Sequence, residues 1–261
     1  MTLVKHELKQ GKASFLIWTG AIGLLLAVCV FLFPEMKGQT DGLNEIFTSM
    51  GSLSEASGMD QLNFGTLEGF YAIECGNVLG LGGAFYAAFC AVGVLSKEEK
   101  GRTAEFLLTH PVSRARMITE KLTAVILQIT AMNLILYGLS VCSMAAIGES
   151  IPWKNVTLLH IAYFLLQIEL AGICFGLSAF LRKSSIGAGL GIAVMMYFLN
   201  LIANIADAAD FLKHITPFAY CEGADIIKNG SLDGVKVAIG MTFCVIGIMA
   251  AYLEYTKKDI Q

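Results

Sequence analysis

The sequence predicts an all-α integral membrane protein with six transmembrane helices. Of its 261 residues, 56% are hydrophobic and 15% are charged, whereas soluble domains average about 25% charged residues. Six apolar stretches are each long enough, at about 20 residues or more, to cross a bilayer. Lys and Arg residues gather in alternate connections between these stretches, as in multi-pass proteins. We therefore interpret residues 1–261 as a single transmembrane domain.

The first span, at about 14–33, follows an amphipathic segment. Val4, Gly11 and Phe15 recur on one helical face of that segment while its lysines lie elsewhere, which favours an N-terminal interfacial helix. Basic residues before an apolar run also occur in secretory signals, but no small-residue cleavage site follows Phe33. We expect an uncleaved first span.

Residues 34–70 form a polar connection with six acidic residues and one Lys. Apolar residues recur through it, so we expect short amphipathic helices on the outer membrane surface. The second span covers about 71–95. Its glycines Gly80, Gly82 and Gly83 predict close approach of neighbouring helices.

The remaining spans are expected at about 114–147, 157–181, 186–206 and 235–255. Ser113 is the expected N-cap of the third span. In the fourth span, Gly172 and Gly176 have the GxxxG spacing of closely packed helix pairs. Before the last span, residues 207–234 predict a second polar connection with amphipathic helical stretches broken at Pro217.

The basic residues also orient the chain. The N-terminal segment, residues 96–121, residues 182–183 and the C-terminal tail together hold 13 of the 18 Lys and Arg residues. Because Lys and Arg accumulate in cytoplasmic loops, we expect these segments and both termini in the cytoplasm. Residues 34–70 and 207–234 are then expected outside.

Residues 96–121 form the longest polar stretch between two apolar blocks and hold six of the basic residues. Within it, Gly101 is expected to end one helix, Thr103 to cap a short new one, and Pro111 to stop that helix. The short helix has an apolar tip at 106–108. It is suited to a groove in a partner protein or to the lipid surface, and residue types leave both open.

Polar residues inside the spans are costly in hydrocarbon and tend to face a partner or a cavity. Glu169 lies near the middle of the fourth span and Glu74 near the outer rim of the second. Asn77 and Asn200 lie along the second and fifth spans. We expect these four as candidate pathway or gating residues. For Glu169 the alternative is a hydrogen bond that only fixes helix packing.

No motif for catalysis or metal binding is present among the four His and seven Cys residues, so we expect no enzyme activity, no catalytic residue and no metal. No basic aromatic stripe suggests nucleic acid. Most cysteines lie in apolar runs, where they behave as small hydrophobic residues. A disulfide between Cys75 and Cys221 stays open, because both are expected near the outer surface.

The sequence EEKGRTAEFLLTHPVSRARMITEKL after the second span resembles the permease subunits of ABC-2 type ABC transporters. Members of that family commonly have E-x-G-T-x-E-F-L-L-x-x-P-V-S-R and a later Lys at this place. The matching residues are Glu99, Gly101, Thr103, Glu105, Phe106, Leu107, Leu108, Pro111, Val112, Ser113, Arg114 and Lys121. Arg102 is inserted where the pattern has Gly-Thr. Near the last span, ITPFAY resembles the family's S-P-F-x-Y, with Thr216 in place of Ser.

This resemblance implies that the short helix is a cytoplasmic coupling helix that contacts a separate ATPase subunit. The coupling residues that it implies are Thr103, Glu105, Phe106, Leu107, Leu108, Pro111 and Arg114. It also implies that two permeases, identical or related, pair with two ATPases that bind ATP and Mg²⁺, whereas this chain binds no cofactor. Export across a bacterial plasma membrane is the family's usual role.

Two other functions stay open at this point. The chain is also compatible with an ion-coupled secondary transporter that uses Glu169 as its proton or cation site. A membrane anchor or sensor subunit without transport is the third alternative. An ATPase partner distinguishes the first function from both.

Overall fold

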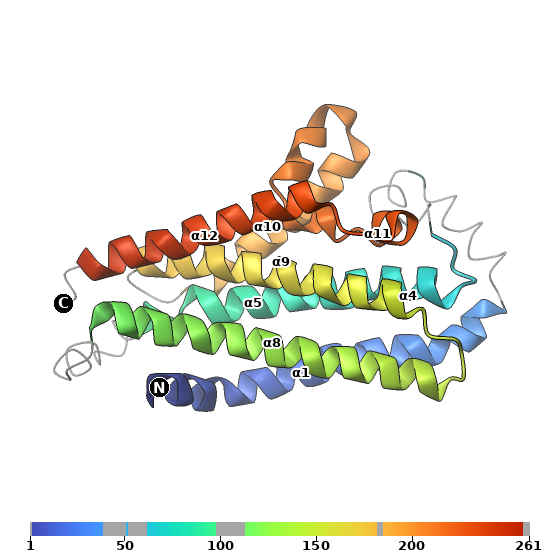
Figure 1. The fold of residues 1–261 in the computed structure, drawn as a ribbon, viewed down its shortest axis with the longest axis horizontal. Helices are drawn as coiled ribbons and strands as arrows, with labels where there is room; N and C mark the ends of the chain where they lie inside the picture. Colours follow the sequence, from blue (N-terminus) through green and yellow to red (C-terminus); the bar gives the residue numbers. More distant parts are fainter. Residues whose placement is uncertain (1, 39–50, 52–61, 98–112, 182–184, 258–261) are drawn as a thin grey trace.

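The computed structural model describes residues 2–38, 51, 62–97, 113–181 and 185–257. These residues form a bundle of long helices (Figure 1), and the described part of the chain has no β-strand. Six of its helices are long and apolar enough to cross a membrane. The predicted fold class is therefore confirmed.

The long helices are α1 (Thr2–Lys37), α8 (Arg114–Ala146), α9 (Trp153–Phe180), α10 (Ile186–Ile205) and α12 (Gly234–Lys257). The second span is built from α4 (Leu67–Cys75), the π-helical segment η2 (Gly76–Leu81) and α5 (Gly82–Val92). Between α10 and α12 lie the 3₁₀ helices η3 (Asp207–His214) and η4 (Pro217–Tyr220) and the helix α11 (Gly223–Asn229). Except for α1, the span boundaries lie within a few residues of the predicted ones.

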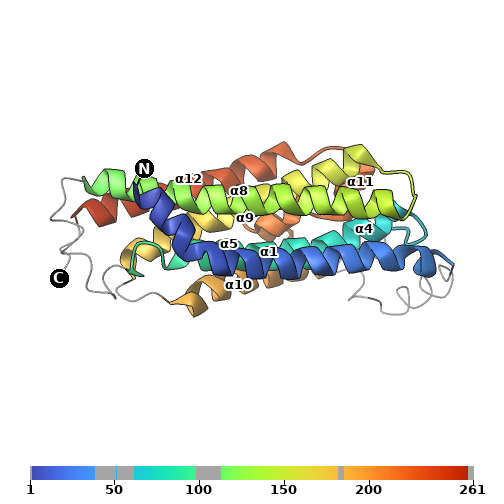
Figure 2. The same ribbon diagram turned by 90° about the horizontal axis from the view of Figure 1, so that it is seen from below.

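Helix α1 differs most from the prediction. The amphipathic start and the first span form one continuous helix, which passes Pro34 and ends at Lys37 rather than near Phe33. Pro34 has no N–H, so α1 lacks one backbone hydrogen bond there, and only about one turn follows before the helix ends. Figure 2 shows the first turns of α1 inclined to the rest of the helix. Val4 and Glu7 in these turns are buried, so this segment packs against the bundle.

Helix α9 is the centre of the bundle and contacts α12, α5 and α8. The α9 and α12 backbones meet at the predicted GxxxG pair. A Cβ added to Gly176 would lie 2.5 Å from the carbonyl oxygen of Gly247, and one added to Gly247 would lie 2.5 Å from that of Gly172. Only glycine allows this approach. The predicted close helix contact is confirmed.

The glycines of the second span also lie at helix contacts. A Cβ on Gly80 would lie 2.9 Å from the Tyr163 ring of α9, and one on Gly83 would lie 2.2 Å from Gln167. A Cβ on Gly82 would instead lie 3.2 Å from Ile22 of α1. The expectation of close approach is confirmed, with two different neighbouring helices involved.

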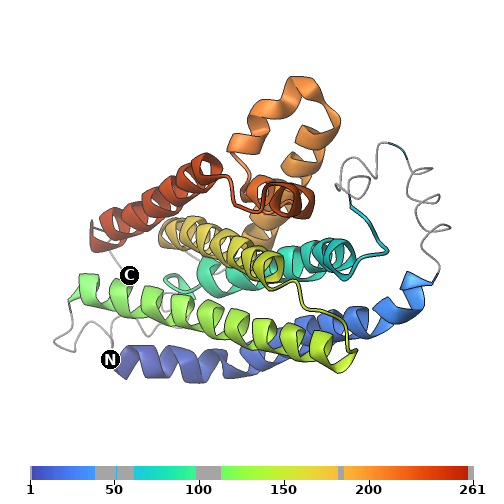
Figure 3. The ribbon, with the colours of Figure 1, turned by 45° about the vertical axis from the view of Figure 1, so that its right-hand side comes forward.

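The two ends of the bundle differ. Helix α1 begins and α12 ends at the same end, where α5 also ends and α8 begins (Figure 1). The segment after α10 that holds η3 stands off the bundle toward the other end (Figures 1 and 3). The short helices predicted within 207–234 are confirmed, with Pro217 starting η4. Most of 34–70, including its predicted amphipathic helices, lies outside the described residues.

All seven cysteines lie in the described residues, and each is a free thiol. Cys75 and Cys221 are both buried. The disulfide that the sequence left open is therefore not formed in this structure.

Candidate functional site

The segment that the sequence singles out, residues 98–112, lies outside the described residues. It contains six of the predicted coupling residues, Thr103, Glu105, Phe106, Leu107, Leu108 and Pro111. The structure does describe what holds its two flanks, Lys97 on one side and Ser113 with Arg114 on the other. We call the polar contacts around these flanks the basal network.

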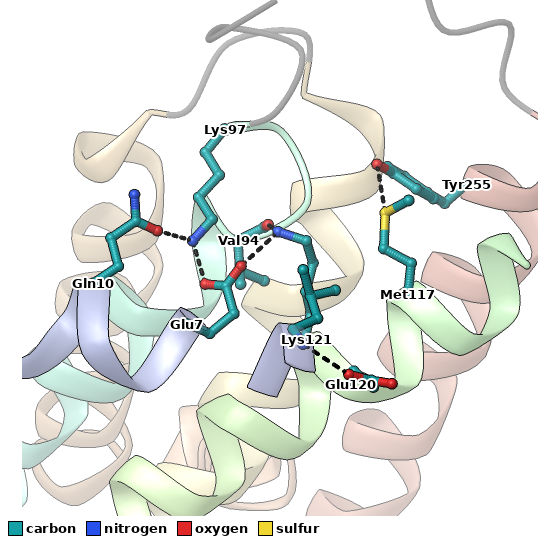
Figure 4. A network of polar contacts seen from close by, with 9 residues as sticks. Glu7, Gln10, Val94, Lys97, Met117, Glu120, Lys121 and Tyr255 are labelled. Atoms are coloured by element: carbon teal, nitrogen blue, oxygen red, sulfur yellow. Dashed lines mark hydrogen bonds and ion pairs between the residues drawn. The ribbon is translucent and has the colours of Figure 1, made fainter. Parts of the chain in front are cut away.

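Glu7 of α1 is the centre of the basal network (Figure 4). Its Oε1 accepts a hydrogen bond from Lys121 Nζ at 2.8 Å, and its Oε2 accepts one from Lys97 Nζ. Lys121 Nζ also donates to the carbonyl oxygen of Val94 at 2.8 Å, and Lys97 Nζ donates to Gln10 Oε1 at 2.7 Å. One carboxylate therefore joins α1, the segment after α5, and α8.

Burial makes this ion pair important for structure. Lys121 is 0% exposed and Glu7 is 4% exposed. A charge removed from water is tolerated only when it is paired and hydrogen-bonded. The Glu7 carboxylate thus compensates the buried Lys121 ammonium, and Lys121 together with Lys97 compensates Glu7.

Local sequence explains how these side chains meet. Glu7 follows Val4 by three residues and precedes Gly11 by four, so it lies on the inward face of α1. Lys121 shares its face of α8 with the buried residues Met117 and Ala124. Both charges thus lie within otherwise apolar helix faces and point into the same contact.

The other flank is bound to the last helix. Ser113 caps α8, because its Oγ accepts a hydrogen bond from Arg116 N at 3.3 Å, which confirms the predicted cap. The Arg114 guanidinium donates to the carbonyl oxygen of Thr256 at 3.2 Å. Tyr255 Oη, also in α12, donates to Met117 Sδ at 3.7 Å (Figure 4). The start of α8 is therefore held against the end of α12.

A further contact ties α8 to the start of α1. Glu120 accepts a hydrogen bond from Arg116 Nε at 3.0 Å and one from the backbone N of Leu3 at 3.1 Å. Together with Glu7, this contact fixes the first two turns of α1 along α8. The residues on both sides of 98–112 are consequently held by contacts among α1, the segment after α5, α8 and α12.

Among the predicted pathway residues, Glu169 is fully buried in α9. Its Oε2 accepts a hydrogen bond from Tyr220 Oη of η4 at 3.0 Å. Burial raises the pKa of Tyr220 well above its ordinary value, so the phenol keeps its proton and donates. A Cβ added to Gly240 of α12 would lie 2.1 Å from the same oxygen. Glu169 thus lies in the contact between α9, α12 and η4.

Asn77 and Asn200 are brought together, although they belong to different spans. Both line a pocket between η2, α10, η4 and α11. Glu169 does not line this pocket. Glu74 is apart from it as well, and accepts a hydrogen bond from Cys29 Sγ at 3.4 Å. The four candidate residues therefore fall into three separate places.

Sequence reasoning missed several residues that the structure brings into these sites. The sequence does not single out Glu7 or Lys97, and Lys121 and Tyr220 enter only as members of the two motifs. An acidic residue on the apolar face of an amphipathic helix was the signal for Glu7. For Tyr220 the signal is its place in ITPFAY, whereas its contact with Glu169 depends on how η4 folds back.

Comparison with known proteins gives two findings. A family model described as "ABC-2 family transporter protein" matches residues 1–260. A relative in Bacillus subtilis (strain 168), described as "Uncharacterized protein YhcI", is 26% identical over 216 residues, which are 73% of this chain and 68% of the relative.

Proposed function

The chain belongs to the ABC-2 transporter family, whose model matches residues 1–260, and on that premise we propose that it is the permease subunit of an ATP-binding cassette exporter driven by a separate ATPase. Membership in this family and six apolar helices make it a multi-pass membrane component of a transporter. The proposal adds the ATPase partner, the export direction and the residues that couple the two subunits.

The observation that supports coupling most directly is the basal network. Lys97 and Arg114 lie on either side of 98–112, and they are bound to α1 and α12 respectively. A force applied to the segment between them would reach several helices at once, because buried ion pairs and packed helices move as units. This is the property required of a coupling helix that acts as a lever.

The movement has a route through the bundle. Helix α8 contacts α9, and α9 packs closely on α12. The Tyr220–Glu169 hydrogen bond then links α9 to η4, whose Phe218 lines the pocket with Asn77 and Asn200. We assign Asn77 and Asn200 to the substrate pathway, Glu169 to its gating, and Glu74 to the rim of the second span.

In this mechanism ATP and Mg²⁺ bind the ATPase, and closure of the ATPase pair pulls on the coupling helices of two permease chains. Those chains, identical or related, would then alternate between inward- and outward-open states. The basic asymmetry of the sequence supports an orientation with both termini in the cytoplasm, and the family resemblance supports a bacterial plasma membrane.

An ion-coupled transporter is the second candidate. It is favoured by one observation: Glu169 is buried, and in the described part of the chain its Oε1 has no hydrogen-bond partner. A carboxylate in such a place is a reasonable proton or cation site. The two functions differ in their energy source, which makes them experimentally separable.

The test is purification of the tagged permease from native membranes, with its bound proteins identified by mass spectrometry. We expect a protein with a Walker A motif in stoichiometric amounts and ATP hydrolysis in the same fraction. Vesicles reconstituted with this fraction should then show transport that depends on ATP. Transport that is driven by an imposed proton gradient, in vesicles without any ATPase, would instead identify the ion-coupled transporter.

A further inference from the structure

A polar pocket lies where α10, η4 and α11 meet the second span. It has a volume of about 70 Å³, and one water needs roughly 10–15 Å³ of such volume. A small head group or a few waters would therefore fill it. The side chains that line it and matter for recognition are Asn77, Tyr163, Tyr197, Asn200, Phe218 and Glu222.

Glu222 gives this pocket a negative charge. It precedes α11 as its N-cap residue, yet its side chain makes no capping hydrogen bond. It turns instead toward α10, where Asn200 Nδ2 donates to its Oε1 at 3.0 Å and Asn204 Nδ2 donates to the same oxygen. Amide donors are neutral, so they hold the carboxylate in place without cancelling its charge.

Lys213, a cation near Glu222, is bound by a different carboxylate. The pKa of Lys213 in η3 is raised, first by its hydrogen bond to Asp210 and to a smaller extent by Glu222 and Asp225. Lys213 Nζ is paired with Asp210 at 2.9 Å. Glu222 therefore contributes to an acidic field in this region, while this lysine is bound by a different carboxylate.

Asn200 supplies a second acceptor. Its Nδ2 is used by Glu222, but its Oδ1 is buried and, among the described residues, has no hydrogen-bond partner. A buried acceptor of this kind costs free energy unless a donor reaches it. The residue is 7% exposed, and it lines the pocket. A bound donor would satisfy it.

Three aromatic rings form a further part of the wall. Tyr197 and Phe218 pack edge to face with ring centroids 5.4 Å apart, and Tyr163 is fixed by donating its hydroxyl to the carbonyl oxygen of Cys221 at 3.0 Å. Aromatic faces attract cations, most strongly where water is excluded. Glu222, an asparagine whose amide oxygen has no described partner, and aromatic rings thus line one small space.

We propose that this pocket binds a primary ammonium group. Its positive charge would lie against Glu222, one of its N–H groups would donate to Asn200 Oδ1, and its carbon next to nitrogen would contact the aromatic wall. The site follows from the pocket alone and does not depend on an ATPase partner. An ammonium group reaches it either on a soluble amine or as the head group of a lipid.

Binding is measured by saturation-transfer difference NMR with ethylammonium as the probe and purified protein in phosphatidylcholine nanodiscs. Ethanol, of similar size but neutral, is the matched probe. We expect saturable ethylammonium binding in about the millimolar range, because so few atoms make contact. Ethylammonium should bind on the order of tenfold more tightly than ethanol. Equal binding of the two would overturn the proposal.

Three variants locate the site. Glu222→Gln keeps the acceptor for the asparagines and should weaken ethylammonium binding on the order of tenfold. Asp225→Asn makes the same change of charge at an exposed carboxylate of α11 and should leave binding unchanged. Asn77→Lys, at an exposed lining position, places a tethered ammonium in the pocket and should abolish ethylammonium binding. This variant tests the site independently of whether Glu222→Gln folds. Undiminished binding in Asn77→Lys would contradict the proposal.

Phosphatidylethanolamine distinguishes the two sources of the ammonium group. If a lipid head group occupies the pocket, nanodiscs that contain this lipid should reduce the ethylammonium signal in the parent protein and in Asp225→Asn. If the natural ligand is a soluble amine, the signal should not depend on the lipid. Both results require ethylammonium binding that depends on Glu222. If no preparation shows such binding, the proposed site is refuted.

Discussion

Glu7 and Lys121, which lie 114 residues apart in the chain, form a 2.8 Å ion pair in which both side chains are buried. The pair joins α1 to α8 at the base of the segment that we propose as the coupling helix. Glu7 also pairs with Lys97, the last described residue before that segment. The strength of these pairs therefore bears on both the fold and the proposed coupling.

The first prediction concerns this pair. Glu7→Gln removes the buried carboxylate that Lys121 and Lys97 share, and breaking a buried ion pair from one side should destabilise the protein by about 3–5 kcal/mol. The double variant Glu7→Gln with Lys121→Met should recover part of that loss, because it also removes the buried Lys121 ammonium. Thermal unfolding in detergent measures the stability of Glu7→Gln, of Lys121→Met and of the double variant. Effects of the two single changes that simply add would show that the residues do not act as a pair.

The second prediction concerns the glycine contact between α9 and α12. Gly176→Ala places a methyl group 2.5 Å from the Gly247 carbonyl oxygen, so the helices must separate, at a cost of about 1–3 kcal/mol. Gly191→Ala in α10 is the matched control, since nothing lies within 4 Å of its added Cβ. That change should be neutral or stabilising by up to about 1 kcal/mol. Equal melting temperatures for the two variants would argue against backbone contact between α9 and α12.

The third prediction concerns Glu169. Glu169→Gln keeps the acceptor for Tyr220 Oη and nearly the same shape, but removes the titratable proton. If Glu169 gates the pathway, as we propose, the variant should assemble normally and show reduced coupled ATP hydrolysis with an altered pH dependence. Activity equal to the parent protein across pH would assign Glu169 to helix packing alone.

The fourth prediction concerns orientation. In a background without native cysteines, Asp225→Cys should react with a membrane-impermeant maleimide added to intact cells, because 207–234 is expected outside. Ala104→Cys should react only after the membrane is opened. The reverse pattern would invert the assigned topology, and labelling of both positions in intact cells would rule out the assignment of these two segments to opposite sides.

Much of the fold could be predicted because its signals are local. Span length, the Ser113 cap and the spacing of Gly172 and Gly176 each depend on residues close in sequence. The pairing of Glu7 with Lys121 could not be derived in this way. It depends on which faces of two distant helices meet, and apolar length says nothing about helix rotation.

The pocket illustrates the same limit. Asn77 and Asn200 were predicted as functional because amides are unusual inside spans. Their common pocket arises only when η4 and α11 fold back onto α10 and bring in Glu222. Similarly, the continuous α1 was not predicted, because Pro34 usually ends a helix and only packing against the bundle shows that here it does not.

The most direct test of the proposed function is a change at residues 106–108, the apolar tip expected of the proposed coupling helix. Each of Phe106, Leu107 and Leu108 gains about 1.5–3 kcal/mol when fully removed from water. A close-fitting protein groove cannot accept a carboxylate there without opening or desolvating it. A helix resting on lipid, in contrast, can rotate to expose it. Phe106→Leu is the matched control, since it keeps most of the apolar area.

The measurement is pull-down of the ATPase, together with its ATP hydrolysis, for Phe106→Asp and Phe106→Leu at equal amounts of inserted permease. We predict that Phe106→Asp loses ATPase binding or coupled hydrolysis while Phe106→Leu retains most of both. Phe106→Asp that binds the ATPase and supports turnover like the parent protein would contradict the assignment of this segment as the coupling helix.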